Sequence, residues 1–222
     1  MRKIILASAS PRRKEILTKT GFEFEIMVSG CDENIDEKRP DRLVMKLSAL
    51  KAEDVAEKNE NALIIGSDTV VAHKGEILGK PASKEDAVRM IKSFAGDRHQ
   101  VYTGVTVIVT GFSEEEKKKI LKACERLDSQ ICESSVNIIN IGKLRSIKVT
   151  FCVCTDVHVL PMTDKEIENY VETGEPMDKA GAYAIQGLFA PFISKIDGDY
   201  YNVVGLPIAS LYMILKSVTE DV

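Results

Sequence analysis

Two neighbouring arginines follow an apolar segment near the start of the chain. Residues 7–13 read ASASPRR, in which Ser10 and Pro11 are typical of the N-cap and the first residue of a helix. Arg12 and Arg13 then fall in the first helical turn, where free backbone N–H groups attract anions and cations are disfavoured. Because arginine side chains match phosphate oxygens, we interpret this segment as a phosphate-binding site. The structural alternative is a capped helix with two solvent-exposed arginines.

One acid interrupts a strongly apolar segment further along the chain. Residues 63–71 read LIIGSDTVV, and both strand propensity and desolvation oppose Asp68 in this position. Such a carboxylate can bind Mg²⁺ through its oxygens or act as a base toward an attacking water. The structural alternative is a carboxylate that caps a turn or pairs with a buried lysine. We favour the functional interpretation.

Two lysines also stand out from their surroundings. Lys51 interrupts the apolar stripe of a helix expected over 41–57, and Lys80 lies in the sequence Gly-Lys-Pro directly after an expected hairpin. Each lysine alone is more typical of a side chain that extends to solvent. Together with the arginines and the isolated acid, they indicate a polyphosphate site around a metal ion.

An acidic loop over residues 31–37 offers further metal ligands. Glu33 is one candidate there, and Asp32, Asp36 and Glu37 are equal to it by composition. A solvated surface loop is the structural alternative. Elsewhere, five cysteines without a CxxC pair argue against a disulfide framework or a zinc site, and the three histidines form no nucleophilic motif.

Composition excludes several broad classes of protein. The chain has 222 residues, of which 44% are hydrophobic and 29% charged, so one globular domain over 1–222 is expected. A net charge of -4 provides no general basic field for nucleic acid or anionic lipid. We find neither an export signal nor an apolar segment of about 20 residues, the length that a membrane-spanning helix needs. We therefore expect a cytoplasmic protein that binds neither nucleic acid nor membranes.

Hydrophobic patterning predicts strands and helices that alternate along the chain. A Lys-Gly pair at 74–75 indicates a hairpin, so an α/β fold on a mixed sheet is expected. The expected strands cover 3–7, 23–28, 63–72, 76–78, 100–110 and 149–160, and the expected helices 11–20, 41–57, 84–94, 163–172 and 206–218. Residues 111–145 differ in character and predict a charged helix over 114–127 and an added strand over 136–141. We interpret them as a peripheral insertion without a catalytic role.

Six segments together resemble the Maf nucleoside triphosphate pyrophosphatases. The match extends from end to end apart from about 111–145, where the family usually has a short connection. The resemblance implies a mixed twisted sheet flanked by helices, with two lobes around a cleft as in Maf and ITPase-like proteins, and a homodimer. The matching segments are ASASPRR at 7–13, SDTVV at 67–71, GKP at 79–81, QVYTGV at 100–105, GEPMDKAGAYAIQG at 174–187 and VVGLP at 203–207.

The resemblance also implies an activity. Family members hydrolyse a nucleoside triphosphate between the α and β phosphates in a reaction that depends on a divalent cation, Mg²⁺ or alternatively Mn²⁺ or Co²⁺. Asp68 would be the proton acceptor that activates water, and Glu33 and Asp68 would lie near the metal. The residues carried over as phosphate ligands are Ser8, Arg12, Arg13, Lys51 and Lys80.

Within the family, Arg12, Thr69 and Gln186 resemble the branch that acts on dTTP and UTP. A glutamine carboxamide offers a donor and an acceptor to the edge of uracil or thymine. On a regular strand, however, Thr69 points away from Asp68, so the threonine reaches the base only if the strand bends or ends nearby. A 7-methyl-GTP pyrophosphatase and a nucleotide-sensing regulator of cell division are the rival hypotheses.

Overall fold

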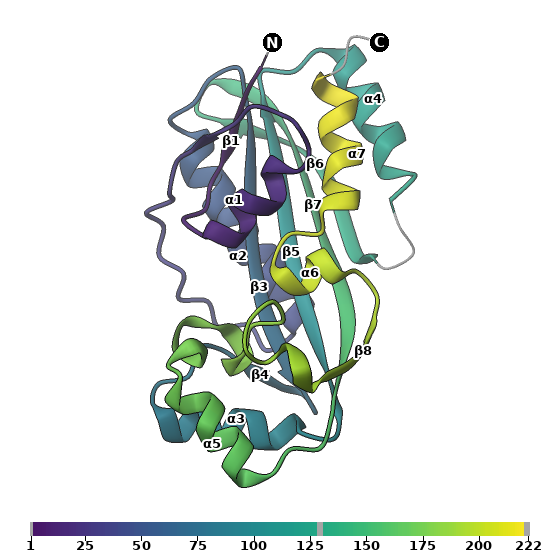
Figure 1. Cartoon of the computed structure of the whole chain (residues 1–222). Helices are drawn as coiled ribbons and strands as arrows, with labels where there is room; N and C mark the ends of the chain where they lie inside the picture. The colour runs from purple at the N-terminus through teal and green to yellow at the C-terminus, as the bar shows by residue number, and fades with distance from the viewer. Residues whose placement is uncertain (1, 128–130, 220–222) are drawn as a thin grey trace.

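The computed structural model describes residues 2–127 and 131–219, which form an eight-stranded mixed sheet flanked by helices (Figure 1). The α/β fold expected from the sequence is confirmed. The strands are β1 (Lys3–Leu6), β2 (Glu25–Ile26), β3 (Ala62–His73), β4 (Glu76–Leu78), β5 (Arg98–Thr110), β6 (Ile131–Ile141), β7 (Leu144–Val159) and β8 (Ile193–Asp197). The helices are α1 (Pro11–Thr18), α2 (Pro40–Ala56), α3 (Lys84–Phe94), α4 (Glu114–Cys124), α5 (Asp164–Glu172), α6 (Tyr200–Val204) and α7 (Ile208–Thr219), with 3₁₀ turns at Glu175–Asp178, Ala180–Ala182 and Ala190–Phe192.

The main strands lie in the order β2-β1-β3-β5-β7-β6, with β4 paired to β3 and β8 paired to β7. Strand β1 is parallel to both β2 and β3, whereas the β3–β5, β5–β7 and β7–β6 pairs are antiparallel. Figure 1 shows β3, β5 and β7 extending through the whole length of an elongated molecule. These long strands therefore connect the two lobes into one sheet.

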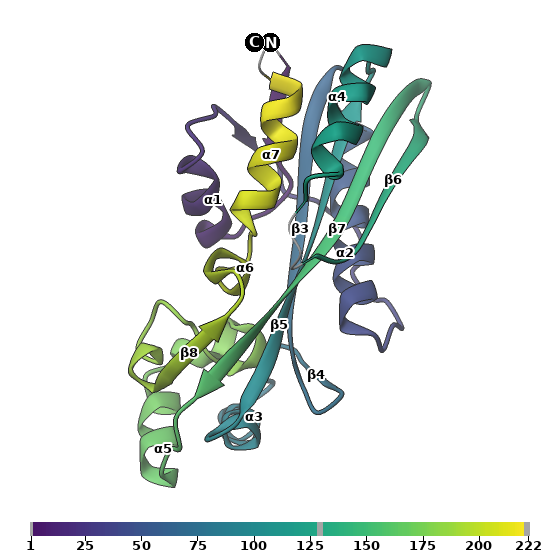
Figure 2. The same ribbon diagram turned by 90° about the vertical axis from the view of Figure 1, so that its right-hand side faces the viewer.

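Helix α2 covers one face of the sheet, and α1, α4 and α7 cover the other (Figure 2). Two glycines allow α2 to approach the strands closely. A Cβ at Gly66 of β3 would lie 2.2 Å from the Ser48 carbonyl oxygen, and one at Gly104 of β5 would lie 2.3 Å from the Val44 carbonyl oxygen. Any larger residue at these positions would push α2 away from β3 and so move Lys51.

Separate apolar clusters stabilise the two lobes. The upper lobe buries side chains from β1, β3, β5, β7, α1 and α7, including Leu6 and Leu215. The lower lobe buries an aromatic group that includes Phe94 of α3 and Phe189, together with side chains from α5. None of the helices in the described parts of the chain is long and apolar enough to cross a membrane.

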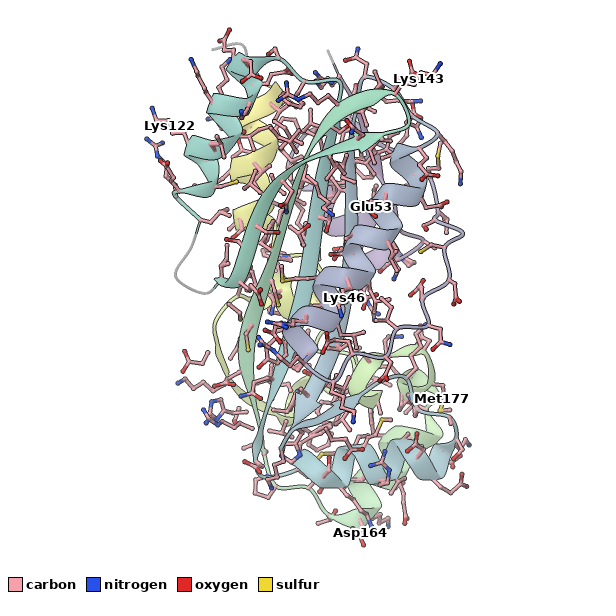
Figure 3. The ribbon with its side chains drawn as sticks, turned by 180° about the vertical axis from the view of Figure 1, so that it is seen from behind. Lys46, Glu53, Lys122, Lys143, Asp164 and Met177 are labelled. Carbon is pink, nitrogen blue, oxygen red and sulfur yellow. The ribbon has the colours of Figure 1, made fainter. Side chains whose placement is uncertain are left out.

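Residues 111–145 form a helix and an added edge strand, as expected. Ser113 caps α4 with a capping box completed by Glu116, and Ile120 is fully buried against the upper core. The helix ends at Cys124, three residues before the predicted end, and Glu125 and Arg126 lie in a turn. Strand β6 begins five residues earlier than predicted, and residues 128–130 lie outside the described part. Figure 3 shows Lys122 and Lys143 of this segment at the opposite end of the molecule from Asp164 and Met177.

Candidate active site

A cavity of about 540 Å³ lies where the edge of the sheet is interrupted. Strand β3 pairs with β1 over Ala62–Ile65 and with β4 from Val71, so residues 66–70 have no strand neighbour on this edge in the described chain. Side chains from both faces of β3 can therefore reach the same cavity. Its lining includes all nine residues proposed from the sequence: Ser8, Arg12, Arg13, Glu33, Lys51, Asp68, Thr69, Lys80 and Gln186.

The ammonium group of Lys51 joins the two candidate metal-binding acids. Its Nζ lies 2.6 Å from Asp68 Oδ1 and 2.9 Å from Glu33 Oε2. Lys51 and Asp68 have only 11% and 15% of their side chains exposed, whereas Glu33 is 55% exposed. Three separate elements thus converge on one charge cluster: α2, β3 and the acidic loop.

The acidic loop contributes one carboxylate of its four to the cavity. Glu33 lines the cavity and contacts Lys51, whereas Glu37 pairs with Lys46 on the outer side of α2. Asp32 accepts a hydrogen bond from the backbone N–H of Asn34. Composition offered no way to choose among these acids, and the contact with Lys51 distinguishes Glu33.

Arg12 and Arg13 have different environments although they are adjacent. The guanidinium of Arg13 donates to Gly205 O at 2.9 Å, to Thr69 Oγ1 at 3.0 Å and to Ser8 Oγ at 3.2 Å. Burial lowers the pKa of Arg13, and the Asp68 carboxylate partly offsets this effect. Arg13 is therefore a structural cation that holds α1 to β3 and to the C-terminal segment.

Arg12 is half-buried and has no ion pair or hydrogen bond within the described residues. Lys80 lines the same cavity, is exposed and likewise has no such partner in the described chain. Its segment is held in place because Gly181 N donates to Gly79 O at 3.0 Å. Unpaired cations that line a cavity are available to an anionic ligand.

Thr69 points to the opposite face of β3 from Asp68, as strand geometry requires. Asp68 faces α2, where Lys51 lies, whereas Thr69 Oγ1 accepts from Arg13 and lies 3.0 Å from Thr103 Oγ1. The strand does not end at this point, and its pairing with β5 continues through Asp68 and Thr69 without a shift of register. Both side chains nevertheless border the cavity because the edge of β3 is open between β1 and β4.

Gln186 borders the cavity from a turn in which Gly187 N donates to Ala184 O at 3.0 Å. The same C-terminal segment supplies two charged cavity residues that the sequence analysis did not propose, Asp178 and Lys179. They form an ion pair with each other, and the side chain of Lys179 is 16% exposed. The available signal was their position in GEPMDKAGAYAIQG, one of the six segments that resemble the Maf family.

Comparison with known proteins shows the family. The Maf-like protein family matches residues 3–140 and 113–218, which together cover nearly the whole chain. The chain belongs to the Maf family. All six Maf-like segments contribute residues to the cavity, whereas none of the cavity residues comes from 111–127 or 131–145.

Curated relatives match this Maf chain over almost their full lengths. A protein of Lachnoclostridium phytofermentans named dTTP/UTP pyrophosphatase is 43% identical over 222 residues, covering 100% of this chain and 98% of its own. Proteins with the same name from Alkaliphilus metalliredigens and Bacillus cereus are 44% and 41% identical, covering 97% and 100% of this chain and 95% and 98% of their own. The alignments with the Lachnoclostridium and Bacillus proteins cover the whole Maf chain, and so include residues 111–145.

Proposed function

We propose that this Maf protein hydrolyses dTTP and UTP between the α and β phosphates. The products are the nucleoside monophosphate and pyrophosphate, so the reaction removes excess or aberrant pyrimidine nucleotides. The observation that carries the proposal is the cavity in which Asp68 and Lys51 lie 2.6 Å apart, beside the unpaired cations Arg12 and Lys80. The relatives named dTTP/UTP pyrophosphatase support the choice of substrate.

The cations are suited to a triphosphate. The cavity of about 540 Å³ is within the range of ordinary small-molecule sites. Arg12 offers a planar fork to two phosphate oxygens, whereas Lys80 and Lys51 offer point charges. Ser8 and the N-terminus of α1 lie beside Arg12, and helix N-termini bind phosphate. We assign Arg13 the indirect role of orienting Ser8 and Thr69, in addition to its charge.

Two carboxylates in a phosphate site are a suitable donor set for a divalent cation, Mg²⁺ or alternatively Mn²⁺ or Co²⁺. Magnesium is typically held by one or two carboxylates together with water and substrate phosphates. Glu33 and Asp68, both within 3 Å of the same ammonium group, would hold it here. The cation would neutralise charge that develops on the phosphates.

Asp68 is our candidate for the proton acceptor that activates water. It is the acid that lies on the open edge of β3, inside a mainly apolar strand, and it is largely buried. A positioned general base requires a fixed carboxylate next to the attacked phosphate. Helix α2 fixes this carboxylate through Lys51, and the close approach of α2 at Gly66 fixes Lys51.

Gln186 is our candidate for recognition of the base, with Arg12 and Thr69 as further residues that set specificity. Its carboxamide can pair with the edge of uracil or thymine, which carries one donor between two acceptors. The rival substrate, 7-methyl-GTP, is not favoured because the relatives carry the dTTP/UTP name. We further expect a cytoplasmic protein that forms a homodimer, and sedimentation of the purified protein would test the dimer.

The experiment is identification of the products. Purified protein is incubated with Mg²⁺ and, separately, dTTP, UTP and 7-methyl-GTP, and the products are separated by anion exchange. We expect equal amounts of monophosphate and pyrophosphate from dTTP and UTP, and loss of the reaction on addition of EDTA. Release of diphosphate and inorganic phosphate would contradict the proposed bond cleavage. Binding of dTTP without any turnover would favour the regulator of cell division.

A further inference from the structure

Glu175 lies outside the cavity lining and binds the chain next to Gln186. Its carboxylate accepts a hydrogen bond from the Tyr170 hydroxyl at 2.9 Å. The backbone N–H of Leu188 donates to both carboxylate oxygens, at 3.1 and 3.0 Å. Glu175 is half-buried at the start of a 3₁₀ turn, and Tyr170 is a buried residue of α5. One acid thus connects α5 with the segment that follows Gln186.

The packing around this acid leaves no space for a side chain at Gly187. A Cβ at Gly187 would lie 2.3 Å from each carboxylate oxygen of Glu175. Gly187 is also the last residue of the turn that begins at Ala184, so the carboxylate contacts the turn at its end. The turn is anchored on its other side by Ile185, which packs against both apolar clusters.

We propose that Glu175 is a positioning residue that sets the specificity of the enzyme through Gln186. The proposal rests on the proposed function, in which Gln186 reads the base. The carboxylate holds the Gly187–Leu188 peptide at a fixed distance from α5, so the carboxamide of Gln186 is presented to the cavity in one place. Recognition of a base edge by hydrogen bonds requires such fixed placement, because a small displacement removes the bonds.

A charged acid is better suited to this role than a neutral side chain. Its two oxygens accept three contacts from two donors, and carboxylates form stronger hydrogen bonds than neutral acceptors. A glutamine at 175 would offer one acceptor oxygen and would direct N–H groups toward the Leu188 N–H. Burial, followed by the hydrogen bond to Glu175, raises the pKa of the Tyr170 hydroxyl, which therefore remains a donor.

The test separates recognition of the base from recognition of the phosphates. The variants are Glu175→Gln, Gln186→Ala and the double variant, with Glu172→Gln as a control because Glu172 pairs with Lys84 on the surface of the same lobe. For each variant, kcat and KM for dTTP are measured, together with the inhibition constant of tripolyphosphate, which has no base. Thermal unfolding establishes that each variant is folded.

We expect Glu175→Gln to raise KM for dTTP about fivefold or more while kcat and the tripolyphosphate constant change by less than about twofold. In the Gln186→Ala background, Glu175→Gln should add nothing. A parallel rise of KM and of the tripolyphosphate constant, or full additivity of the two substitutions, would overturn the proposal.

A second variant keeps the test valid if Glu175→Gln does not fold. Gly187→Ala displaces the same carboxylate without changing it and should give the same KM effect. A KM for dTTP in Glu175→Gln close to the wild-type value would count against a role for Glu175. A wild-type protein that turns over no pyrimidine nucleotide would instead refute the proposed function itself.

Discussion

Lys51 and Asp68 form an ion pair of 2.6 Å across two elements, α2 and β3, that meet through Gly66. The same lysine lies 2.9 Å from Glu33. A single ammonium group therefore contacts both proposed metal-binding acids of the cavity. The orientation of Asp68 depends on helix α2, which is separated from β3 by a loop in the sequence.

Replacement of Lys51 by Met tests this arrangement. We expect kcat/KM for dTTP to fall about 100-fold or more, because the variant loses a charge near the phosphates and leaves two acids unpaired. The matched control is Lys46→Met, since Lys46 pairs with Glu37 on the outer side of the same helix (Figure 3). Steady-state kinetics check both variants, and equal activity in the two would remove Lys51 from the site.

Arg12 and Arg13 should differ in what their loss does to stability. Arg13→Ala removes donors from Gly205 O, Thr69 and Ser8, so we expect the free energy of unfolding to fall by about 2–4 kcal/mol. Arg12→Ala should change it by less than about 0.5 kcal/mol. Urea unfolding checks both values.

The same two variants should both lose activity. Arg12→Ala should lower kcat/KM about tenfold or more, because a hydrogen bond to a charged group contributes about 1.5–3 kcal/mol. Unchanged kinetics would show that Arg12 does not contact the substrate. A stability loss in Arg12→Ala as large as that in Arg13→Ala would contradict the different roles assigned to them.

Ile120 tests the role of residues 111–145. Because Ile120 is fully buried, Ile120→Ala should lower the free energy of unfolding by about 2–4 kcal/mol. Leu121→Ala is the control, since Leu121 is 39% exposed on the same helix. We expect kcat and KM below the melting temperature to stay within about twofold of wild type in both variants. A specific loss of kcat in folded Ile120→Ala would give this segment a catalytic role.

Because His99 is buried, we expect the free energy of unfolding to fall in acid. Its Nε2 lies 2.8 Å from the Tyr183 hydroxyl, and burial lowers the pKa of His99 to about 3. An unfolded histidine titrates near about pH 6.5, so only the unfolded state takes up this proton as the pH falls from there to about 3. The contribution of His99 is fully present above that window and is lost by up to about 1.4 kcal/mol per pH unit within it.

The measurement is urea unfolding at pH 7 and at pH 5 for wild type and His99→Gln. We expect the variant to lose less stability than wild type between the two values, by about 1–2 kcal/mol. His158→Gln, which removes a half-buried histidine from the neighbouring strand β7, serves as the matched control. Identical pH dependence in wild type and His99→Gln would contradict a neutral buried histidine.

Much of the site could be predicted from the sequence because its residues lie in short segments with clear local signals. Ser10 and Pro11 indicate the start of α1, and Asp68 is conspicuous inside an apolar strand. Composition does not choose Glu33 among the four acids of its loop. The resemblance to the Maf family singles it out, and so does its tertiary contact with Lys51. The alternation of strands and helices likewise predicted the mixed sheet.

Other features depend on contacts between distant segments and have no local signal. Arg13 looks like Arg12 in sequence, yet its bond to Gly205 joins residues that are 192 positions apart. The open edge of β3, which brings Asp68 and Thr69 to one cavity, results from the short lengths of β1 and β4. The role of Glu175 depends on its hydrogen bond with the backbone of Leu188, which lies 13 positions further along the chain.

Release of pyrophosphate from dTTP by wild type and by Asp68→Asn, with Mg²⁺, tests the central claim most directly. The substitution preserves the size of the side chain but cannot accept a proton from water. We predict that wild type releases pyrophosphate and that folded Asp68→Asn releases it at least about 100-fold more slowly. Equal rates for the two proteins would contradict the account.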